Sequence, residues 1–462
     1  MMVGHDHGCC IGGNTMSLSR LTGVLADLST EHRIPGAQLA VRHRGETYSA
    51  VFGHTAYGTS EPVDWGSRFP FGSVSKSFTA SVAMQLVADG DIDLDEPVDA
   101  HVPELRDIGC LHDVTLRQLL GHTSGLVSDH EIDGRQNTTL RRYVSSLQDS
   151  CKADSAGVAF SYSNTGYVLV GRLIECLTGM SWWDAVESFL AGPLGLTLTP
   201  AVLSDPMASI VTAHSVSAGR VVPVANVLPA AWEPAGGIAG TALDLLKFAE
   251  AHLDGGTNAI LDRDLAELMR RPTGIEPFGV AHAWGLGWGL YLDSYQSMWA
   301  GHDGTLSGTT SALRFDPADG TIVALTTNAT TGLALWADLV DKLAEMGIEV
   351  GDYGGRTVVQ PGQWHDPAEY VGDYVNGTTC FRLRVDAQNL LSLDDGTGFV
   401  ASLTVAGPDT FLVHQKDVST PSHPARFLRD SVTGRIRSMQ FSGRMSSFRT
   451  SINNVERIPV GI

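Results

Sequence analysis

The sequence has few basic residues, few cysteines and no long apolar run. It carries 31 Lys and Arg against 51 Asp and Glu over 462 residues, a formal net charge of −20. Nucleic acids and anionic membranes would repel such a chain, so neither is expected as a partner. No segment reaches the apolar length of a membrane-spanning helix. The six cysteines lack the pair spacing of a disulfide framework.

The N-terminal segment also lacks the features of an export signal. Residues 1–10 read MMVGHDHGCC, with no basic start and no apolar core of signal-peptide length. We therefore predict a disordered leader over residues 1–16 and a cytoplasmic protein. The two histidines and two cysteines of this segment could bind a metal ion, but their spacing does not match zinc sites. A disordered leader is the favoured interpretation.

The composition is that of a globular protein with more than one domain. Hydrophobic residues make up 43% of the chain and charged residues 18%, and 462 residues exceed one ordinary domain. Gly and Pro are frequent over residues 351–364, which predicts a linker between domains at 17–350 and 365–462. Beyond the linker, short alternating segments such as 381–385 and 436–441 are separated by turn residues. This pattern predicts a small antiparallel barrel.

Ser73 and Lys76 are the first candidates for chemistry. They lie three residues apart in FGSVSKSF, at the start of a run with helical apolar spacing that ends at Gly90. On a helix these positions share one face, so the amine can reach the hydroxyl. A desolvated lysine with a lowered pKa is one of the few groups able to activate a serine. The four-residue pattern alone is common by chance.

Tyr162 and Asn164 stand in a second polar segment. The sequence FSYSN at 160–164 ends a loop and leads into a predicted helix that Gly179 closes. A phenol at this junction can relay a proton to a leaving group, while the amide bonds a substrate carbonyl or the lysine. The alternative is a surface tyrosine and a helix-capping asparagine.

His302, Gly304 and Thr305 form a third segment. The sequence WAGHDGT precedes a predicted β-hairpin, with strands at 311–315 and 321–325 around a turn. Glycine at 304 would let a substrate backbone approach closely, and Thr305 would offer a backbone N–H.

These three segments, in this order, resemble the motifs of the serine penicillin-recognising superfamily. That superfamily includes class C β-lactamases, D-stereospecific peptidases and penicillin-binding proteins. The resemblance covers about residues 17–350 and includes three framework stretches, 89–95, 122–126 and 234–238. It implies an α+β fold: a β-lactamase/transpeptidase-like domain with an antiparallel sheet flanked by helices plus a helical lobe. We interpret His122, in the second stretch, as structural.

The third motif departs from the β-lactamase pattern, which has Lys-Thr-Gly where this chain has His302-Asp303-Gly304. A lysine supplies a permanent cation for a carboxylate, whereas histidine is largely neutral at pH 7. His-x-Gly is similar to the motif of D-aminopeptidases, certain esterases and the stand-alone nonribosomal peptide cyclases called penicillin-binding-protein-type thioesterases. β-Lactamase activity is therefore not expected.

The C-terminal module resembles the lipocalin-like domain attached to several D-aminopeptidases and to those cyclases. Arg444, in the segment FSGR, is a candidate to reach the cleft of the first domain and contact substrate. A surface arginine on a strand is the alternative interpretation.

The resemblance implies a mechanism in which Lys76, assisted by Tyr162, activates Ser73 to attack an acyl group. Backbone N–H groups of Ser73 and Thr305 would hold the oxyanion. Tyr162 and His302 would then move protons to the leaving group and from the incoming nucleophile. Such acyl transfer needs neither metal nor nucleotide, so no cofactor is expected.

Three functions follow as hypotheses. The first is macrocyclisation of a nonribosomal peptide, released onto Ser73 from a carrier-protein thioester and attacked by its own N-terminal amine. The second is a D-stereospecific aminopeptidase, amidase or esterase that acts on a small peptide or ester and admits water. The third is a non-catalytic penicillin-binding-like sensor.

Overall fold

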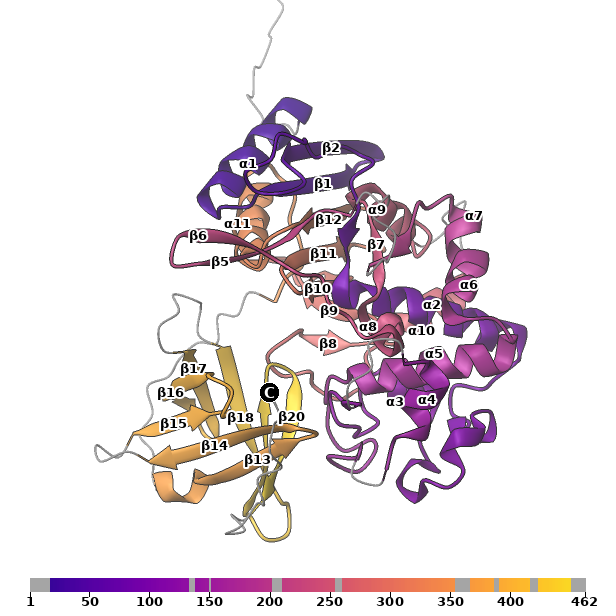
Figure 1. The fold of residues 1–462 in the computed structure, drawn as a ribbon, viewed down its shortest axis with the longest axis vertical. Coiled ribbons are helices and arrows are strands. Elements are labelled where there is room, and N and C mark those ends of the chain that lie inside the picture. The colour runs from indigo at the N-terminus through magenta and orange to yellow at the C-terminus, as the bar shows by residue number, and fades with distance from the viewer. Residues whose placement is uncertain are drawn as a thin grey trace, which may run out of the picture.

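The computed structural model describes residues 17–132, 138–148, 151–201, 210–253, 260–353, 366–385, 390–415 and 423–449. The predicted leader and most of the predicted linker lie outside the described residues. Two bodies are visible in Figure 1, a mixed helical and sheet domain and a β-barrel beside it. Within the described ranges, no helix is long and apolar enough to cross a membrane.

The centre of the first domain is an antiparallel sheet, seven-stranded over the described residues, in the order β2-β1-β12-β11-β10-β9-β8. The strands are β1 (Gly36–His43), β2 (Glu46–Gly53), β8 (Ala283–Trp284), β9 (Gly289–Leu292), β10 (Met298–Leu306), β11 (Thr309–Phe315) and β12 (Ile322–Thr327). The predicted hairpin is confirmed, because β11 pairs with β12 in the register Phe315 opposite Ile322. The segment WAGHDGT, predicted only to precede sheet structure, itself lies in β10.

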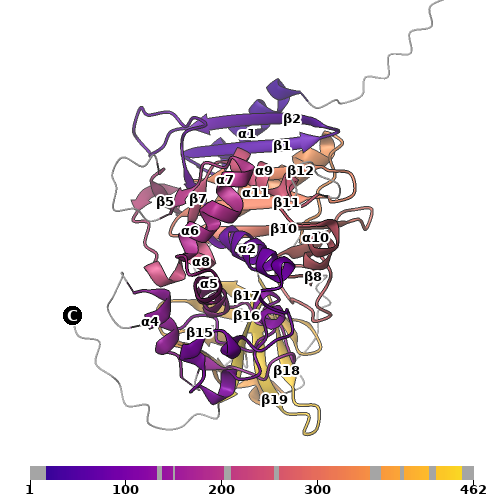
Figure 2. The same cartoon turned by 90° about the vertical axis from the view of Figure 1, so that its right-hand side faces the viewer.

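Alternating side chains on the central strands build a core on each face of the sheet. On β12, Val323 and Leu325 pack against α1 (Leu18–Glu31) and α11 (Gly332–Glu345). Ile322 and Ala324 of the same strand face the opposite side and join the core of the helical lobe. Figure 2 looks onto that lobe, with α2, α5 and α6 in front of the strands.

The lobe is built around α2 (Ser75–Asp89), whose side chains are buried on nearly every face. Ala, Ser and Thr separate its large residues and let neighbours pack closely; Phe78 stacks on Phe248 of α9 with ring centroids 3.7 Å apart. The other helices are α3 (Leu116–Leu120), α4 (Leu140–Ser145), α5 (Asn164–Thr178), α6 (Trp182–Val186), α7 (Gly192–Leu194), α8 (Glu233–Gly236), α9 (Ala242–Glu250) and α10 (Arg263–Met269). The short strands β3 (Phe69–Pro70), β4 (Thr199–Pro200) and β7 (Ile238–Gly240) form a small sheet of their own. A separate hairpin, β5 (Ala213–Ser217) with β6 (Arg220–Val224), lies beside α11 (Figure 1).

The second body is a closed antiparallel barrel in which each strand pairs with the next and β13 pairs with β20. The described strands are β13 (Gly372–Asn376), β14 (Thr379–Val385), β15 (Leu391–Asp394), β16 (Val400–Gly407), β17 (Thr410–Gln415), β18 (His423–Arg429), β19 (Ile436–Phe441) and β20 (Arg444–Arg449). Aromatic and aliphatic side chains such as Tyr374, Phe411 and Phe427 fill its interior. The predicted small barrel is confirmed, while the exact domain limits stay predictions.

Candidate active site

Ser73 and Lys76 meet as the sequence predicts. Ser73 lies in a 3-10 turn (Gly72–Val74) that runs directly into α2, and Lys76 is the second residue of that helix. The Lys76 Nζ lies 3.1 Å from the Ser73 Oγ and donates to the Ala235 carbonyl at 2.6 Å. Ser73 is partly exposed and Lys76 is fully buried. Ser73 is thus the more accessible member of the pair, and the amine lies in the interior.

The surroundings of Lys76 favour its neutral form. Burial lowers the pKa of Lys76 well below its usual value, and the nearby charge of Arg444 lowers it further. The carboxylate of Asp129 acts in the opposite direction. A lysine in this state can accept the proton of Ser73 at neutral pH.

Tyr162 lies against the same pair of residues. It precedes α5, and Ser163, the residue between Tyr162 and the helix, caps that helix by accepting from the Gly166 N–H at 3.0 Å. The Tyr162 ring centroid lies 4.9 Å from Lys76 Nζ. Burial raises the pKa of Tyr162, and a hydrogen bond with the Ser73 hydroxyl partly offsets this. The phenol therefore keeps its proton and can donate it.

His302, on β10, completes the predicted set of side chains near Ser73. Its ring centroid is 6.2 Å from that of Tyr162 and 5.4 Å from that of Trp284. The His302 Nδ1 lies 2.6 Å from the Asp303 carbonyl, which assigns the proton to Nδ1 and leaves Nε2 as an acceptor. Burial and the charge of Lys76 lower the pKa of His302 to about 3. The imidazole is thus neutral at pH 7.

Gly304 brings β10 against the turn that carries Ser73. A Cβ at this position would lie 1.9 Å from the Phe71 carbonyl oxygen and 3.0 Å from the Ser73 nitrogen. Only glycine fits so close a backbone approach. On the same turn, a Cβ at Gly72 would lie 2.7 Å from the Thr305 nitrogen. The backbones at Ser73 and Thr305 therefore lie close together, which makes their amides candidates for an oxyanion hole.

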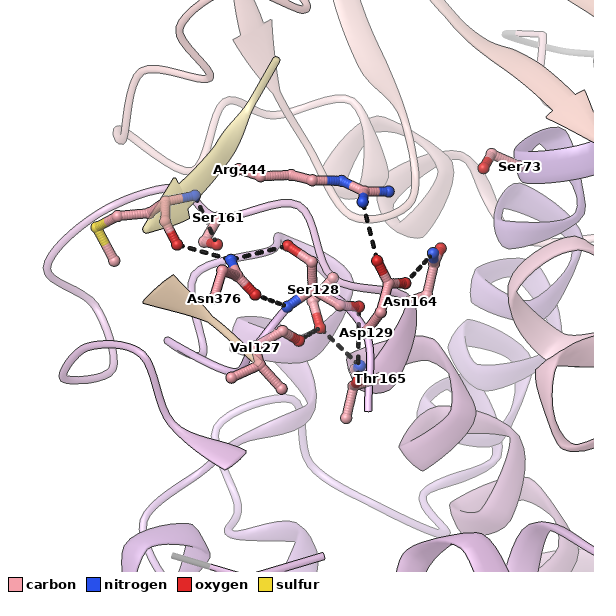
Figure 3. A network of polar contacts seen from close by, with 12 residues as sticks. Ser73, Val127, Ser128, Asp129, Ser161, Asn164, Thr165, Asn376 and Arg444 are labelled. Atoms are coloured by element: carbon pink, nitrogen blue, oxygen red, sulfur yellow. Dashed lines mark hydrogen bonds and ion pairs between the residues drawn. The ribbon is translucent and has the colours of Figure 1, made fainter. Parts of the chain in front are cut away.

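Asn164 and Arg444 meet at a residue that the sequence analysis missed, Asp129 (Figure 3). Asn164, the first residue of α5, donates through Nδ2 to Asp129 Oδ1 at 2.6 Å. Arg444, the first residue of β20, donates through Nη1 to Asp129 Oδ2 at 2.9 Å. Its guanidinium lies 5.9 Å from the Tyr162 ring centroid. The structure thus places a barrel arginine beside Tyr162.

His122, interpreted from the sequence as structural, also lies within the site. It is buried, and its Nδ1 accepts from the Ser163 N–H at 3.1 Å. Its ring centroid is 4.3 Å from that of Tyr162. These contacts fix the backbone beside Tyr162, which is a structural role next to the reacting groups.

Comparisons with known proteins agree with this geometry. A family model described as Beta-lactamase matches residues 21–345. "Penicillin-binding protein 4" of Amycolatopsis lactamdurans is 35% identical over 357 residues, which cover 74% of this chain and 91% of that protein. The crystal structure of SurE is 33% identical, with a TM-score of 0.83, and covers 94% of this chain and 99% of its own.

A D-stereospecific amidohydrolase from Streptomyces sp. is 27% identical, with a TM-score of 0.56, and covers 68% of this chain and 95% of its own. The likeness to SurE extends over almost the whole chain, whereas the amidohydrolase covers about two thirds. With a serine, a buried lysine and a tyrosine in mutual contact, the chain belongs to the β-lactamase family and is a serine hydrolase or acyltransferase of the penicillin-binding-protein fold.

Proposed function

We propose that this protein is a trans-acting peptide cyclase that releases a peptide from a thioester and closes it through an ester on Ser73. The observation that carries the acyl-enzyme chemistry is the 3.1 Å contact between the partly exposed Ser73 hydroxyl and the buried Lys76 amine. The His-x-Gly motif and the C-terminal barrel, both of which resemble those of the stand-alone peptide cyclases, support cyclisation within this chemistry.

Acylation begins when neutral Lys76 accepts the Ser73 proton and the oxygen attacks the thioester carbonyl. The backbone N–H groups of Ser73 and Thr305 hold the oxyanion. When the C–S bond breaks, the proton passes from Lys76 through Tyr162 to the leaving sulfur. The peptide is then an ester of Ser73, and the thiol departs.

In the cyclisation step the protons move in the opposite direction to acylation, and a different nucleophile attacks. The N-terminal amine of the same peptide attacks the ester carbonyl, and Tyr162 with Lys76 takes up the proton that the amine loses. Neutral His302 can accept a hydrogen bond from that amine through Nε2. The C–O bond breaks, Ser73 regains its proton, and a cyclic amide leaves.

The substrate class in this proposal is a peptide whose acylated residue has the D configuration. One solved relative, SurE, is described with D-Leu and is 33% identical with a TM-score of 0.80. Another is a D-stereospecific amidohydrolase. A carrier protein that delivers the thioester, and a cytoplasmic location, belong to the same proposal.

The second candidate is a D-stereospecific aminopeptidase, amidase or esterase in which water attacks the ester. The amidohydrolase and a D-amino acid amidase from Ochrobactrum anthropi, 27% identical with a TM-score of 0.58, favour it. Both candidates use the same acyl-enzyme, so they differ only in the second nucleophile.

A linear peptide thioester ending in a D-residue separates the two candidates, with mass spectrometry as the readout. Cyclisation yields a product that has lost only the thiol, whereas hydrolysis yields the linear acid. The same peptide ending in the L-residue tests stereospecificity, and Ser73→Ala reports background. Exclusive hydrolysis of the D-peptide and of small amides would contradict the cyclase function. A non-catalytic sensor would show no labelling of Ser73 by a fluorophosphonate.

A further inference from the structure

Asp129 joins one residue from each domain, Asn164 and Arg444. Its two carboxylate oxygens accept separately, Oδ1 from Asn164 at 2.6 Å and Oδ2 from Arg444 at 2.9 Å. The Asp129 side chain is 24% exposed and that of Arg444 42% exposed, so the pair borders solvent. A carboxylate in this position sets the geometry of both neighbours.

The contact with Asp129 fixes the orientation of the Asn164 amide. An ionised carboxylate only accepts, so the nitrogen of the amide must face Asp129. The Asn164 oxygen is then left to accept from the Lys76 amine or from an N–H of a bound peptide. Without the carboxylate, the amide could turn over and present a donor in the same place.

The barrel holds the backbone of the Ser128–Asp129 segment. Asn376, at the end of β13, accepts from the Ser128 N–H at 2.7 Å and donates to the Ser128 hydroxyl at 3.0 Å. Its amide also donates to the Met445 carbonyl at 2.6 Å, beside Arg444. Figure 3 shows this amide between the two segments. One buried side chain thus ties the segment to β20.

The same segment supports the start of α5. The Ser128 carbonyl accepts from the backbone N–H groups of Asn164 at 2.8 Å and Thr165 at 3.2 Å. These are N-terminal N–H groups of α5, which need partners outside the helix. A shift of Ser128 would therefore move Asn164 through its backbone as well as through its side chain.

The turn after β13 approaches the backbone of Asp129 too closely to allow a side chain at position 377. Gly377 has a φ of 59°, and a Cβ there would lie 2.6 Å from the Asp129 carbonyl oxygen. Both the left-handed backbone and the missing space require glycine. The turn after β13 is thus shaped to seat this segment.

We propose that Asp129 is a positioning residue for the acyl transfer, held by Asn376, so that the barrel is an integral part of the active site. The proposal rests on the acyl-enzyme chemistry of the proposed function and holds for cyclisation and hydrolysis alike. Asp129 orients Asn164 toward the cleft and keeps the Arg444 guanidinium beside Tyr162.

Electrostatics supports the same assignment. Asp129 and Arg444 act on Lys76 in opposite senses, the carboxylate raising its pKa and the guanidinium lowering it. Burial of Lys76 remains the largest influence. Removing one partner of the ion pair leaves the charge of the other uncompensated at Lys76, which a pH profile detects.

The test compares Asp129→Asn with a matched variant, Asp154→Asn. Asp154 also forms an ion pair across the domain interface, with Arg437 of β19, at a similar 18% exposure. Its other oxygen accepts from the Ser155 N–H at 2.8 Å, and within the described residues it makes no contact with Ser73, Tyr162 or Asn164. The two variants therefore lose the same kind of interdomain contact.

We expect Asp129→Asn to lower kcat for p-nitrophenyl acetate about 100-fold, the cost of displacing a catalytic group by about 1 Å. KM for this small ester should change little. The acid limb of the pH profile should move to lower pH, because the Lys76 ammonium loses a stabilising charge. Asp154→Asn should stay within about twofold of wild type in kcat, as expected for a partly exposed ion pair.

Equal kcat and an unmoved acid limb for Asp129→Asn would overturn the proposal, as would equal losses in both variants. If Asp129→Asn does not fold, Arg444→Gln supplies the second reading. That change removes a positive charge near Lys76, so the acid limb should move to higher pH, and an unmoved limb counts against the proposal. Fluorophosphonate labelling of wild-type Ser73 is measured first. Absence of labelling would contradict the proposed function itself, and there would then be no acyl transfer for Asp129 to support.

Discussion

The two halves of the active site are held in place by different means. Ser73 and Lys76 lie three residues apart, and one turn and the start of one helix bring them to 3.1 Å. Tyr162 and Asn164 lie at the start of α5, and part of their surroundings comes from the barrel. The Tyr162 N–H donates to the Gly443 carbonyl at 2.9 Å, more than 250 residues along the chain. The first half is local, and the second depends on docking of the two domains.

This difference predicts which substitutions abolish activity and which only lower it. Loss of a group in the local half should abolish the acyl-enzyme while the fold stays intact. Loss of a contact in the docked half should lower kcat and also loosen the interface. The predictions below test the contrast, from the largest effect to the smallest.

Ser73→Ala should reduce turnover by on the order of 10⁴-fold or more, because no other group can carry the acyl intermediate. The Ser73 side chain is partly exposed, so its removal should leave the melting temperature close to that of wild type. Initial rates with p-nitrophenyl acetate and a thermal melt check both statements. Activity near the wild-type level would show that another residue is the nucleophile.

Gly304→Ala tests the backbone side of the local half. The added Cβ would lie 1.9 Å from the Phe71 carbonyl oxygen, so β10 and the Ser73 turn must move apart. We expect a loss of about 100-fold in kcat from misplaced oxyanion donors. The crowding should also lower the free energy of unfolding by about 1 to 3 kcal/mol. Chemical denaturation and ester hydrolysis together measure the change, and unaltered kcat would argue against an oxyanion hole at Thr305.

The local half is also the half that the sequence predicts. The i and i+3 spacing places Ser73 and Lys76 on one face whatever the rest of the fold does. Periodicity likewise predicts the end of α2 at Gly90, the β11–β12 hairpin and the barrel strands, because each pattern is local. The rest of the predicted site follows from the family resemblance, which rests on the order of the three motifs.

The docked half contains the residues that sequence reasoning missed. Asp129 is one acidic residue in a loop and Asn376 is one amide at a strand end, and neither has a local signal. Their roles arise from hydrogen bonds between distant segments, with 248 residues between Ser128 and Asn376 and 315 between Asp129 and Arg444. Arg444 could be named only as a candidate, because nothing in its own strand shows that it faces the other domain. Contacts of this kind become visible only in three dimensions.

Asn376→Ala is the sharpest test of the docked half from the barrel side. The substitution leaves the Ser128 N–H and the Met445 carbonyl without their partner in a buried interface. Unpaired buried groups of this kind cost about 1 to 3 kcal/mol in the free energy of unfolding. We expect kcat to fall roughly tenfold, less than the ~100-fold that a full displacement of a catalytic group costs. Kinetics unchanged from wild type would show that the catalytic domain orders its own segment.

The pH profile of the wild-type enzyme tests the protonation states of two buried bases, Lys76 and His302. Burial lowers the pKa of Lys76 well below its usual value, so activity should persist at neutral pH and fall only as Lys76 takes up a proton. The pKa of His302 is about 3, so no second acid limb should occur near pH 6.5. The kcat/KM for an ester across this range shows whether one limb or two are present. A limb near pH 6.5 that His302→Gln removes would contradict the neutral, buried imidazole.

Glu276→Gln should have the smallest effect of these changes, because it alters an interdomain contact that does not support Tyr162 or Asn164. Glu276 pairs with Arg426 of β18 across the interface, but its side chain is 61% exposed, so solvent reaches the carboxylate. Exposed ion pairs contribute about 0 to 1 kcal/mol, and salt screens them. We therefore expect stability within about 0.5 kcal/mol of wild type and unchanged kcat. A loss of activity as large as that of Asn376→Ala would mean that docking as a whole, rather than the contacts at Ser128 and Asp129, sets the geometry of Tyr162 and Asn164.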